Sequence, residues 1–437
     1  MRPSLSYRLL AGLAGTILPL ATRLSPRLAA GDEGRRRSLE RILQWSRERR
    51  EAARPLVWFH APSLGEGRQA EAVLTRVRAE RPEWQFAFTH FSPSAIGLAA
   101  ELPVDVAGFL PWDSPGPIRQ LIGALRPAAL VFAKLDLWPE LVGQAAAAGA
   151  AVALVAGTVS RHSGRTRWPS RRLTRSAYAT VDAAGAISQL DAERLATLGL
   201  PADRIVITGD PRADSVADRV AAVHPEEPLL ALGDSSTLVA GSTWPEDEAV
   251  LVSALRRLRA DGGKRHRLII APHEPTAAHL TRLESSARQA GLTTERLGRL
   301  ASGSVPTSGG RQDVLLVDRV GILATLYGAG SVGYVGGGFG RAGLHSVLEP
   351  AAWGRPVVFG PRWQASRDAE LLLEAGGGRA LALDNPAAQL AATWREWSAP
   401  AGQAAGAFAR GVVEQGIGSA RRSAELVISL VEQRLRG

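Results

Sequence analysis

Short apolar runs alternate with helical spacing through most of the chain, and this alternation predicts the fold. After residue 54, seven runs have the length and apolar character of buried strands. They are 56–59, 86–89, 106–110, 128–132, 151–155, 183–187 and 205–207, and a second series follows at 238–240, 268–271, 314–317, 332–335 and 356–359. Strands that alternate with helices predict a mainly parallel sheet with helices on both faces.

The two series predict two domains. A chain of 437 residues is too long for one ordinary core, and a polar, broken stretch at 209–227 separates the series as a linker would. We expect an α/β protein of two doubly wound, Rossmann-like domains, 51–215 and 216–437, that face each other across a cleft. The final residues, 387–436, have a helical pattern, and these helices are candidates for crossing back to the first domain.

The first 50 residues differ from the rest in pattern and charge. Residues 9–21 are apolar and are flanked by Arg8 and Arg23. This run is shorter than the ~20 residues that span a bilayer. We interpret residues 1–50 as a membrane-associated arm that lies on, or dips into, the cytoplasmic face of a membrane. The alternative is an ordinary packed helix with a solvated basic face.

The charge of the chain favours an anionic partner. There are 52 Lys plus Arg against 42 Asp plus Glu, a net charge of +10, and residues 1–54 alone hold twelve arginines against five acids. Nucleic acid, anionic lipid or a phosphorylated substrate would suit such an excess. Aromatic residues total only 5% and no nucleic-acid recognition module is present, so we expect no nucleic acid partner. The absence of cysteine excludes disulfide and thiolate chemistry.

The stretch 332–362 has the most distinctive local pattern. A short apolar strand leads into the glycine-rich residues 336–340, where a backbone without Cβ can approach a ligand closely. We expect a helix to start directly after these glycines. The apolar residues of 344–351 would lie on one face, and Glu349 would lie one and a half turns from the start of the helix. Such a helix start favours an anionic ligand, and Glu349 could bind a sugar diol. The glycines also fit G-x-G-x-x-G, but the next strand ends at 359–361 without the acid that a dinucleotide site needs.

Polar residues follow the strands of the first series, at the edge where ligands of doubly wound sheets bind. Ser63 and Glu66 follow the first strand at the spacing of a capping box; the alternative is that Glu66 is a general base on a helix N-terminus. Lys134 and Asp136 follow the fourth strand, and Asp136 is the nearest rival for the catalytic role. Candidate contacts to an anionic acceptor are Ser63, Ser92, Lys134 and Arg161, the last in a segment, 161–175, with six arginines and no acid.

The second series ends its strands in small hydroxyl residues and histidines. Ser242 and Thr243 follow one strand, His273 follows the next, and His345 lies on the glycine-rich stretch. A single histidine is more often structural than catalytic. No two histidines have the spacing of a zinc helix, and no Asp/Glu cluster suits magnesium, so the sequence predicts no metal site.

Six motifs follow one another between about residues 54 and 376. They are WFHAPSLGE at 58–66, KLDLW at 134–138, GDPRAD at 209–214, GSTW at 241–244, APHE at 271–274 and HSVLEPA at 345–351. In order and spacing, this series resembles that of the 3-deoxy-D-manno-octulosonic acid (Kdo) transferases of lipid A biosynthesis. The basic, apolar N-terminal segment is similar to the membrane anchor of that family.

The resemblance implies a GT-B glycosyltransferase that moves Kdo from CMP-Kdo to a lipid A precursor with inversion, at the inner membrane, without metal or cofactor. It implies that Glu66 is the catalytic base. The donor-binding residues that it implies are Arg212, Ser242, Thr243, His273, Gly338, Gly340, His345, Ser346 and Glu349. Many members carry two glutamates where this chain has Lys134 and Asp136, and Ser346 replaces the commoner Asn. Another enzyme of the same fold, a UDP-sugar transferase or a 2-epimerase, is the alternative.

Overall fold

The computed structural model describes residues 7–8, 25–159, 164–166, 168–262, 265–299 and 312–436. The chain divides into two compact units: Met1–Ser215 with Gly418–Gly437, and Val216–Ile417. The division falls within helix α9 (Arg212–Ala221). The stretch 209–227, expected to be a broken linker, therefore contains a helix.

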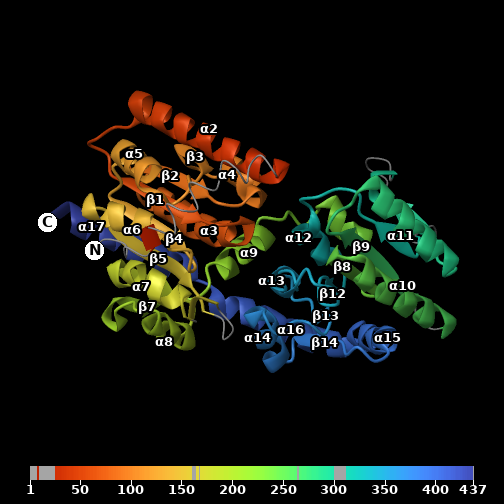
Figure 1. Cartoon of the computed structure of the whole chain (residues 1–437). Coiled ribbons are helices and arrows are strands. Elements are labelled where there is room, and N and C mark those ends of the chain that lie inside the picture. The colour runs from red at the N-terminus through yellow and green to blue at the C-terminus, as the bar shows by residue number, and fades with distance from the viewer. Residues whose placement is uncertain are drawn as a thin grey trace. The chain divides into compact units, whose positions relative to one another are not determined.

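The first unit is built on a seven-stranded parallel sheet in the order β3-β2-β1-β4-β5-β6-β7 (Figure 1). All seven expected runs form strands. They are β1 (Leu56–Ala61), β2 (Gln85–His90), β3 (Val106–Phe109), β4 (Ala129–Ala133), β5 (Ala151–Gly157), β6 (Ala183–Ala186) and β7 (Ile205–Ile207). Every residue of β1, β2, β4 and β5 is buried. Burial on both faces explains why these strands are nearly continuous apolar runs.

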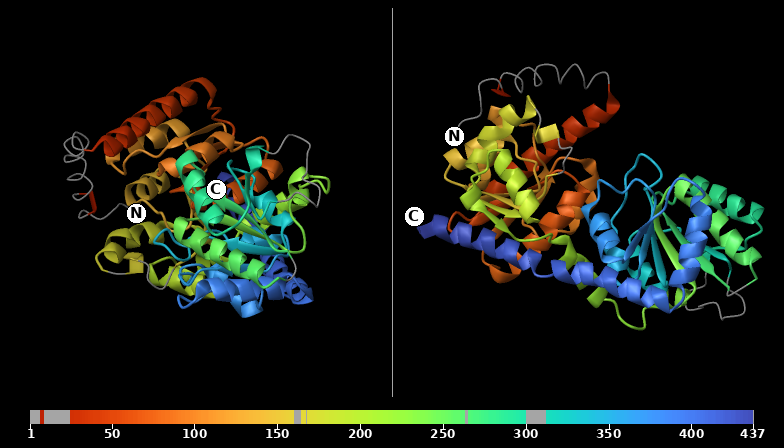
Figure 2. Two further views of the ribbon diagram at one scale, coloured as in Figure 1. Left: turned by 90° about the vertical axis from the view of Figure 1, so that its right-hand side faces the viewer. Right: turned by 90° about the horizontal axis from the view of Figure 1, so that it is seen from below.

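Helices cover both faces of this sheet (Figure 2). One face packs against residues of α2, α5, α6, α7 and α8, and the other against α3, α4 and the last helix, α17. Their bounds are α2 (Pro26–Arg49), α3 (Leu64–Glu80), α4 (Ile96–Glu101), α5 (Pro115–Leu125), α6 (Pro139–Ala147), α7 (Ser170–Thr180), α8 (Gln189–Thr197) and α17 (Ser419–Arg436).

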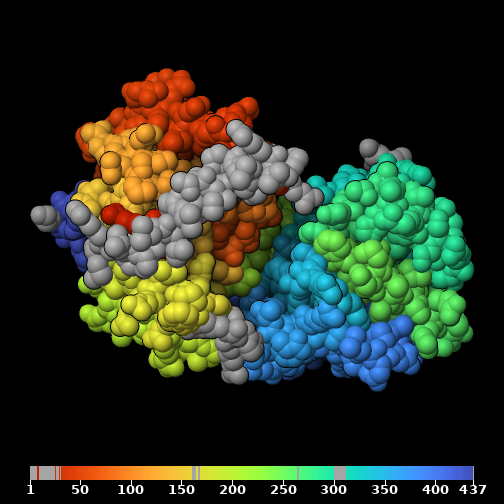
Figure 3. Space-filling model, viewed as in Figure 1, coloured from red at the N-terminus to blue at the C-terminus, as the bar shows by residue number. Residues whose placement is uncertain are grey.

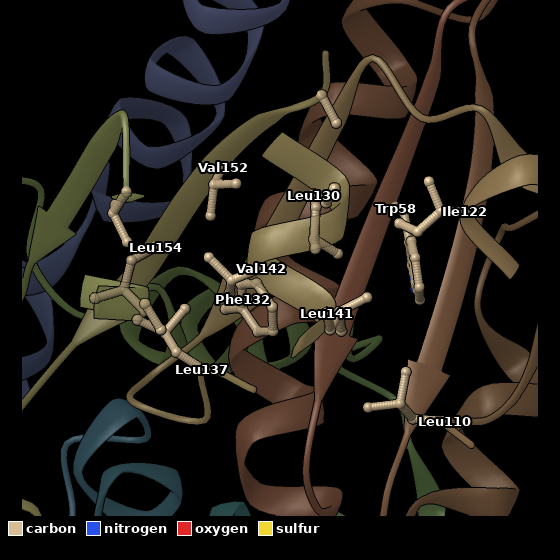
Figure 4. Packing of buried hydrophobic residues seen from close by; sticks show 14 of the residues in the cluster. Trp58, Leu110, Ile122, Leu130, Phe132, Leu137, Leu141, Val142, Val152 and Leu154 are labelled. Atoms are coloured by element: carbon tan, nitrogen blue, oxygen red, sulfur yellow. The ribbon is translucent and has the colours of Figure 1, made fainter. Parts of the chain in front are cut away.

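The core beneath α5 and α6 fixes the central strands (Figure 4). Trp58 of β1 and Phe132 of β4 are fully buried, and Ile122 and Leu141 of the covering helices are at most 5% exposed. Burying a side chain of this size contributes about 1.5–3 kcal/mol. Because β1 and β4 lead directly into the loops of Glu66 and Lys134, this packing also positions the candidate site.

Helix α2 packs on the sheet as part of the first unit. Ile42 is 1% exposed and Trp45 9%, both in the core shared with α5, and α2 (red to orange) lies directly against α5 in Figure 3. The Arg35 guanidinium lies 4.0 Å from the centre of the Phe91 ring and 4.6 Å from that of Trp112. The described part of the expected N-terminal arm is therefore not a separate body.

Two residues from the start of the chain also contact the first unit. The Tyr7 hydroxyl donates to Asp113 at 2.6 Å, and the Arg8 guanidinium donates to both oxygens of Glu140 at 2.9 Å. The Glu140 side chain is 1% exposed, so Arg8 balances a buried charge. The apolar run 9–21 lies outside the described residues. No helix in the part of the chain that the structure describes is both long and apolar enough to cross a membrane.

The second unit repeats the architecture with a parallel sheet in the order β10-β11-β9-β8-β12-β13-β14. Its strands are β8 (Thr237–Thr243), β9 (Arg267–Pro272), β10 (Thr294–Arg296), β11 (Val314–Leu316), β12 (Val332–Val335), β13 (Val357–Phe359) and β14 (Gly378–Ala380). The five expected runs are confirmed. The sequence analysis misses β10 and β14 because their residues, Thr-Glu-Arg and Gly-Arg-Ala, form no apolar run.

The helices of the second unit are α10 (Pro245–Ala260), α11 (Ala277–Gln289), α12 (Leu323–Leu326), α13 (Leu348–Ala352), α14 (Arg367–Ala375), α15 (Pro386–Trp397) and α16 (Pro400–Gly416). The helix expected directly after the glycines forms, but it begins later than predicted. Gly343 has φ 85°, which no right-handed helix accommodates, so the loop stays irregular until α13 begins at Leu348. Glu349 therefore lies in the first turn of a short helix.

Candidate functional site

The first unit brings Glu66 and Lys134 together at the carboxyl ends of its central strands. Glu66 lies in the first turn of α3, which follows β1, and Lys134 directly follows β4. The Lys134 Nζ atom lies 3.2 Å from Glu66 Oε1, and the two side chains are 37% and 20% exposed. Lys134 has φ 61°, a left-handed conformation that is uncommon for a residue with a side chain and that is typical of functional sites.

Glu66 is held in its ionised form. Burial by itself would raise the pKa of this carboxyl, but the Lys134 ammonium and the Ser63 hydroxyl outweigh burial, so the pKa of Glu66 is lowered. The Ser63 hydroxyl donates to Glu66 Oε2, and Ser63 makes no side-chain bond to a backbone N–H of α3. The capping box expected as the structural alternative does not form; both side chains are directed to each other instead.

Ser92 lies on the neighbouring loop, after β2. Its backbone N–H donates to the Pro62 carbonyl at 2.7 Å, so this loop lies against the one that carries Ser63. The Ser92 hydroxyl accepts from the Ser94 N–H at 3.2 Å. The candidate acceptor residues Ser63, Ser92 and Lys134 are thus gathered at one sheet edge. Arg161 lies outside the described residues, and its role stays a prediction.

Asp136, the alternative candidate for the general base, is bound by side chains that sequence reasoning did not identify. Arg165 Nη2 lies 2.8 Å from Oδ1, and the Trp138 indole N–H donates to Oδ2 at 2.9 Å. The pKa of Asp136 is lowered: burial raises it, but His60, Arg165 and Trp138 outweigh burial. Arg165 comes from the arginine-rich segment, so the segment neutralises an acid of the site as well as adding charge.

His60 lies behind Asp136 at the end of β1 and is fully buried. The Thr89 hydroxyl oxygen accepts from the Trp58 indole at 2.8 Å and lies 3.0 Å from His60 Nδ1. If the hydroxyl donates to Nδ1, the His60 proton is on Nε2, which is 3.6 Å from Asp136 Oδ2. This nitrogen is buried without a hydrogen-bond partner, so His60 lies beside Asp136 without a hydrogen bond to it.

Arg212 lies in the first unit, whereas the other predicted donor-binding residues lie in the second. Its guanidinium contacts the Asp210 carboxylate, with Nε 3.0 Å and Nη2 2.6 Å from Oδ2. Gln69 of α3 also donates to Asp210 Oδ1, at 3.3 Å. Asp210 therefore connects the start of α9 to the helix that carries Glu66.

In the second unit, three rings stack at the carboxyl ends of β8 and β9. Trp244 and His273 lie 4.9 Å apart and within 27° of parallel, and His273 and His345 lie 4.5 Å apart and within 29°. The Trp244 indole N–H donates to His345 Nε2 at 3.4 Å. Because Nε2 accepts, the proton of a neutral His345 is on Nδ1. Burial and the neighbouring His273 lower the pKa of His345 to about 4.

The two hydroxyl residues after β8 differ in their surroundings. Thr243 is fully buried, and its hydroxyl donates to Glu248 at 2.9 Å; Glu248 also lies 2.9 Å from His279. Ser242 is half-buried and has φ 52°. Ser242 is thus better placed to contact a ligand, whereas Thr243 is already engaged inside the unit.

Asp247, which sequence reasoning did not identify, anchors the glycine loop. It is fully buried and accepts from the Gly337 N–H at 2.9 Å and from the Tyr334 hydroxyl at 2.8 Å. Gly338 packs so closely on Gly360 that a Cβ would lie 2.6 Å from its backbone N. Gly340 is only partly buried and has no such close neighbour, so its backbone suits a ligand rather than packing.

Glu349 has a cationic partner on α9. Arg219 Nη1 lies 3.3 Å from Glu349 Oε1, and the Glu349 side chain is 20% exposed. The neighbouring Ser346 is exposed. Arg219 lies far from Glu349 in the sequence, so no local pattern could have indicated this pair.

Among the residues that the structure describes, no three His, Asp or Glu side chains lie close enough to hold a metal ion. The expectation of a reaction without metal stays a prediction.

The chain is similar in sequence to proteins of known activity. The family model of the 3-deoxy-D-manno-octulosonic-acid transferases (kdotransferases) matches residues 36–215. A 3-deoxy-D-manno-octulosonic acid transferase from Chlamydophila psittaci is 30% identical over 331 residues, which cover 74% of each chain.

Two solved structures are similar in fold. A glycosyltransferase from Rickettsia africae has a TM-score of 0.57 at 12% identity, covering 88% of this chain and 100% of its own. A UDP-GlcNAc 2-epimerase from Neisseria meningitidis has a TM-score of 0.57 at 11% identity, covering 86% and 100%. At these identities the likeness concerns the GT-B fold alone.

Proposed function

Because this chain belongs to the family of 3-deoxy-D-manno-octulosonic acid (Kdo) transferases, which are glycosyltransferases, we propose that it moves Kdo from CMP-Kdo to a hydroxyl of a lipid A precursor with inversion. The observation that carries this proposal is the pair of Glu66 and Lys134, 3.2 Å apart at the carboxyl end of the first sheet. An acceptor hydroxyl is a poor nucleophile at neutral pH, so the reaction needs a positioned base. The pKa of Glu66 is lowered and its side chain is partly exposed, as that role requires.

In the proposed step, Glu66 takes the proton of the acceptor hydroxyl while the hydroxyl oxygen bonds to C2 of Kdo. The bond between C2 and the phosphate oxygen of CMP breaks, and its electron pair leaves with CMP. Attack opposite to the leaving group inverts the configuration at C2. Lys134 keeps Glu66 ionised, and its partly exposed ammonium is a candidate contact for the phosphate of an anionic acceptor.

The second unit supplies candidate contacts to the leaving CMP. Neutral His345 can donate its Nδ1–H to a phosphate oxygen, and the backbone at Gly340 can approach the phosphate closely. Glu349, held by Arg219, can accept from ribose hydroxyls. Oriented donors of this kind stabilise the charge that develops on a leaving phosphate.

The direct test is incubation of the full-length protein with CMP-Kdo and a tetra-acylated lipid A precursor, followed by mass spectrometry. We expect product that is heavier by whole Kdo residues, with activity retained in EDTA. Failure with CMP-Kdo together with transfer from a UDP-sugar would reject the proposed donor, and would favour the alternative within the same fold.

We also propose that residues 1–50 hold the enzyme on the cytoplasmic face of the inner membrane. The support is the apolar run 9–21 and the arginine excess around it. Deleting residues 1–24 should release the protein from anionic vesicles. Arg8→Met is the matched control, because it removes the contact to Glu140 but keeps the apolar run. If both proteins stay bound at about 0.5 M salt, where surface charge is screened, the arm is not the anchor.

A further inference from the structure

A cavity of about 820 Å³ lies in the second unit, away from the candidate donor site. Its wall includes residues that lead into three neighbouring strands: Gly233 before β8, Gly330 before β12 and Arg355 before β13 (Figure 1). In a parallel sheet, the amino ends of the strands share one edge and the carboxyl ends share the other. His273 and the glycine loop follow carboxyl ends, so the cavity is at the opposite edge.

Two arginines on this wall have no carboxylate partner among the described residues. Arg355 donates to the Gly328 carbonyl from Nη2 at 2.9 Å, and its Nε atom is buried without an acceptor. Arg410 donates to the Trp353 carbonyl from Nη2 at 3.2 Å. Each guanidinium has five N–H donors, so most remain unused. Burial and the proximity of Arg410 lower the pKa of Arg355, as expected for two like charges that face one space.

The start of α16 opens on the same cavity. Ala399, Pro400 and Gln403 line it, and Ala399, at the N-cap position, has no side chain that could cap the helix. The hydroxyl oxygen of Ser398, another lining residue, is buried without a hydrogen-bond partner. A helix of 17 residues therefore directs its positive end at the space that the two arginines face.

Two acids also belong to the wall, and neither pairs with these arginines. Asp234 accepts from the Ser236 N–H at 2.8 Å and from the Thr237 hydroxyl at 3.1 Å. Glu414 is exposed. Trp353 and Trp397 add flat apolar surface.

We propose that this cavity is a second ligand site, which binds a small molecule carrying a phosphate group between Arg355, Arg410 and the start of α16. Planar guanidinium groups and a helix N-terminus are the donors that phosphate prefers in proteins. The volume is within the range of small-molecule sites, so a body such as a sugar or a base fits beside the tryptophans. This site is separate from the proposed transfer reaction.

The experiment is titration of the full-length protein with inorganic pyrophosphate, measured by calorimetry in wild type and in variants of the cavity wall, because binding at the candidate donor site would not respond to those variants. Arg410→Gln removes one charge from the wall. Gln403→Glu keeps the shape of the side chain but adds a negative charge to the cavity, and an acid near the start of a helix does not destabilise it. Arg256→Gln, an exposed position on α10 that does not line the cavity, is the control.

We expect wild type and Arg256→Gln to bind pyrophosphate alike, and the dissociation constant to rise about tenfold or more in Arg410→Gln and Gln403→Glu, as for loss of a charge-assisted contact. The melting temperature of Gln403→Glu should stay at or above that of wild type, which separates lost affinity from lost folding. The proposal is overturned if wild type binds no pyrophosphate, or if folded Gln403→Glu binds it as tightly as wild type.

Discussion

The two units use the same sheet edge for different chemistry. In the first unit, the strand ends carry ion pairs, Glu66 with Lys134 and Asp136 with Arg165. In the second unit, they carry stacked rings and glycine backbone: the ring centres of Trp244 and His273 lie 4.9 Å apart, and those of His273 and His345 lie 4.5 Å apart. The proposed proton transfer thus depends on ion-paired side chains, whereas the proposed nucleotide contacts combine stacked rings and glycine backbone with one ion pair, Glu349 with Arg219.

The largest expected effect tests the charged site. Glu66→Gln keeps the size of the side chain but removes its basicity, so turnover should fall by about 10²–10⁴, while CMP affinity stays near that of wild type. Glu71→Gln, on the same helix in a partly exposed pair with Arg68, is the control. Steady-state kinetics and CMP titration measure both effects. A stable Glu66→Gln enzyme with normal turnover would make Asp136 the next candidate.

The second prediction concerns another charge of the first unit. Arg8→Met leaves the Glu140 carboxylate buried without its ion-pair partner, and such losses cost about 3–5 kcal/mol. We expect the lower end of that range, because Gln144 still donates to Glu140 at 2.8 Å and Arg8 is 37% exposed. Urea denaturation measures the loss.

Adding Glu140→Gln to Arg8→Met should recover much of that stability, because a neutral amide needs no counter-charge. Arg37→Met, in an exposed pair with Glu33, should change stability by less than about 1 kcal/mol. If the double variant is as unstable as Arg8→Met, the contribution of Arg8 is packing and not charge.

The elements that the sequence predicts well are the apolar runs, including β7, an edge strand in which Val206 and Ile207 are 49% and 50% exposed. The twelve expected strands are apolar runs inside two parallel sheets, whereas β10 and β14 are short edge strands with no apolar signature. The helix after the glycines begins later than predicted because helical spacing at 344–351 does not reveal the left-handed Gly343. Buried Val347 satisfies the apolar pattern from an irregular loop.

The candidate site also contains residues that the sequence pattern indicates and residues that it does not. Strand-end position identifies Glu66, Lys134 and His273, because in a parallel sheet the loops after the strands gather at one edge. Strand-end position does not indicate the residues that hold the glycine loop and Glu349 in place. Asp247 under the glycine loop and Arg219 beside Glu349 act through contacts that form only after folding, and their own sequence surroundings are those of ordinary helix residues.

The third prediction tests whether the second unit acts through binding. Glu349→Ala should raise the dissociation constant of CMP by about tenfold, a loss of about 1.4 kcal/mol, and should change turnover at saturating donor much less. A group that holds the ribose acts in the ground state and the transition state alike. Glu374→Gln, an exposed position on α14, is the control. Unchanged CMP affinity would remove Glu349 from the donor site.

The smallest expected change concerns His345 and pH. Its pKa of about 4 in the folded chain lies below the ordinary value of 6.5, so His345 should stay neutral from pH 8 to pH 6, whereas an unperturbed histidine would be about three-quarters protonated at pH 6. NMR titration of the imidazole measures this directly. The phosphate of CMP itself titrates near pH 6, so wild type and His345→Asn should lose affinity for CMP in parallel over this range.

Below pH 6.5 the unfolded chain binds a proton at His345 that the folded chain does not, so this histidine lowers the free energy of unfolding as the pH falls from 6.5 towards 4. His345→Asn should therefore narrow the difference in unfolding free energy between pH 7 and pH 5. An imidazole that titrates near 6.5 would mean that His345 is mostly protonated at pH 6, and the contrast between an ion-paired edge and an edge of stacked rings would not hold at that pH.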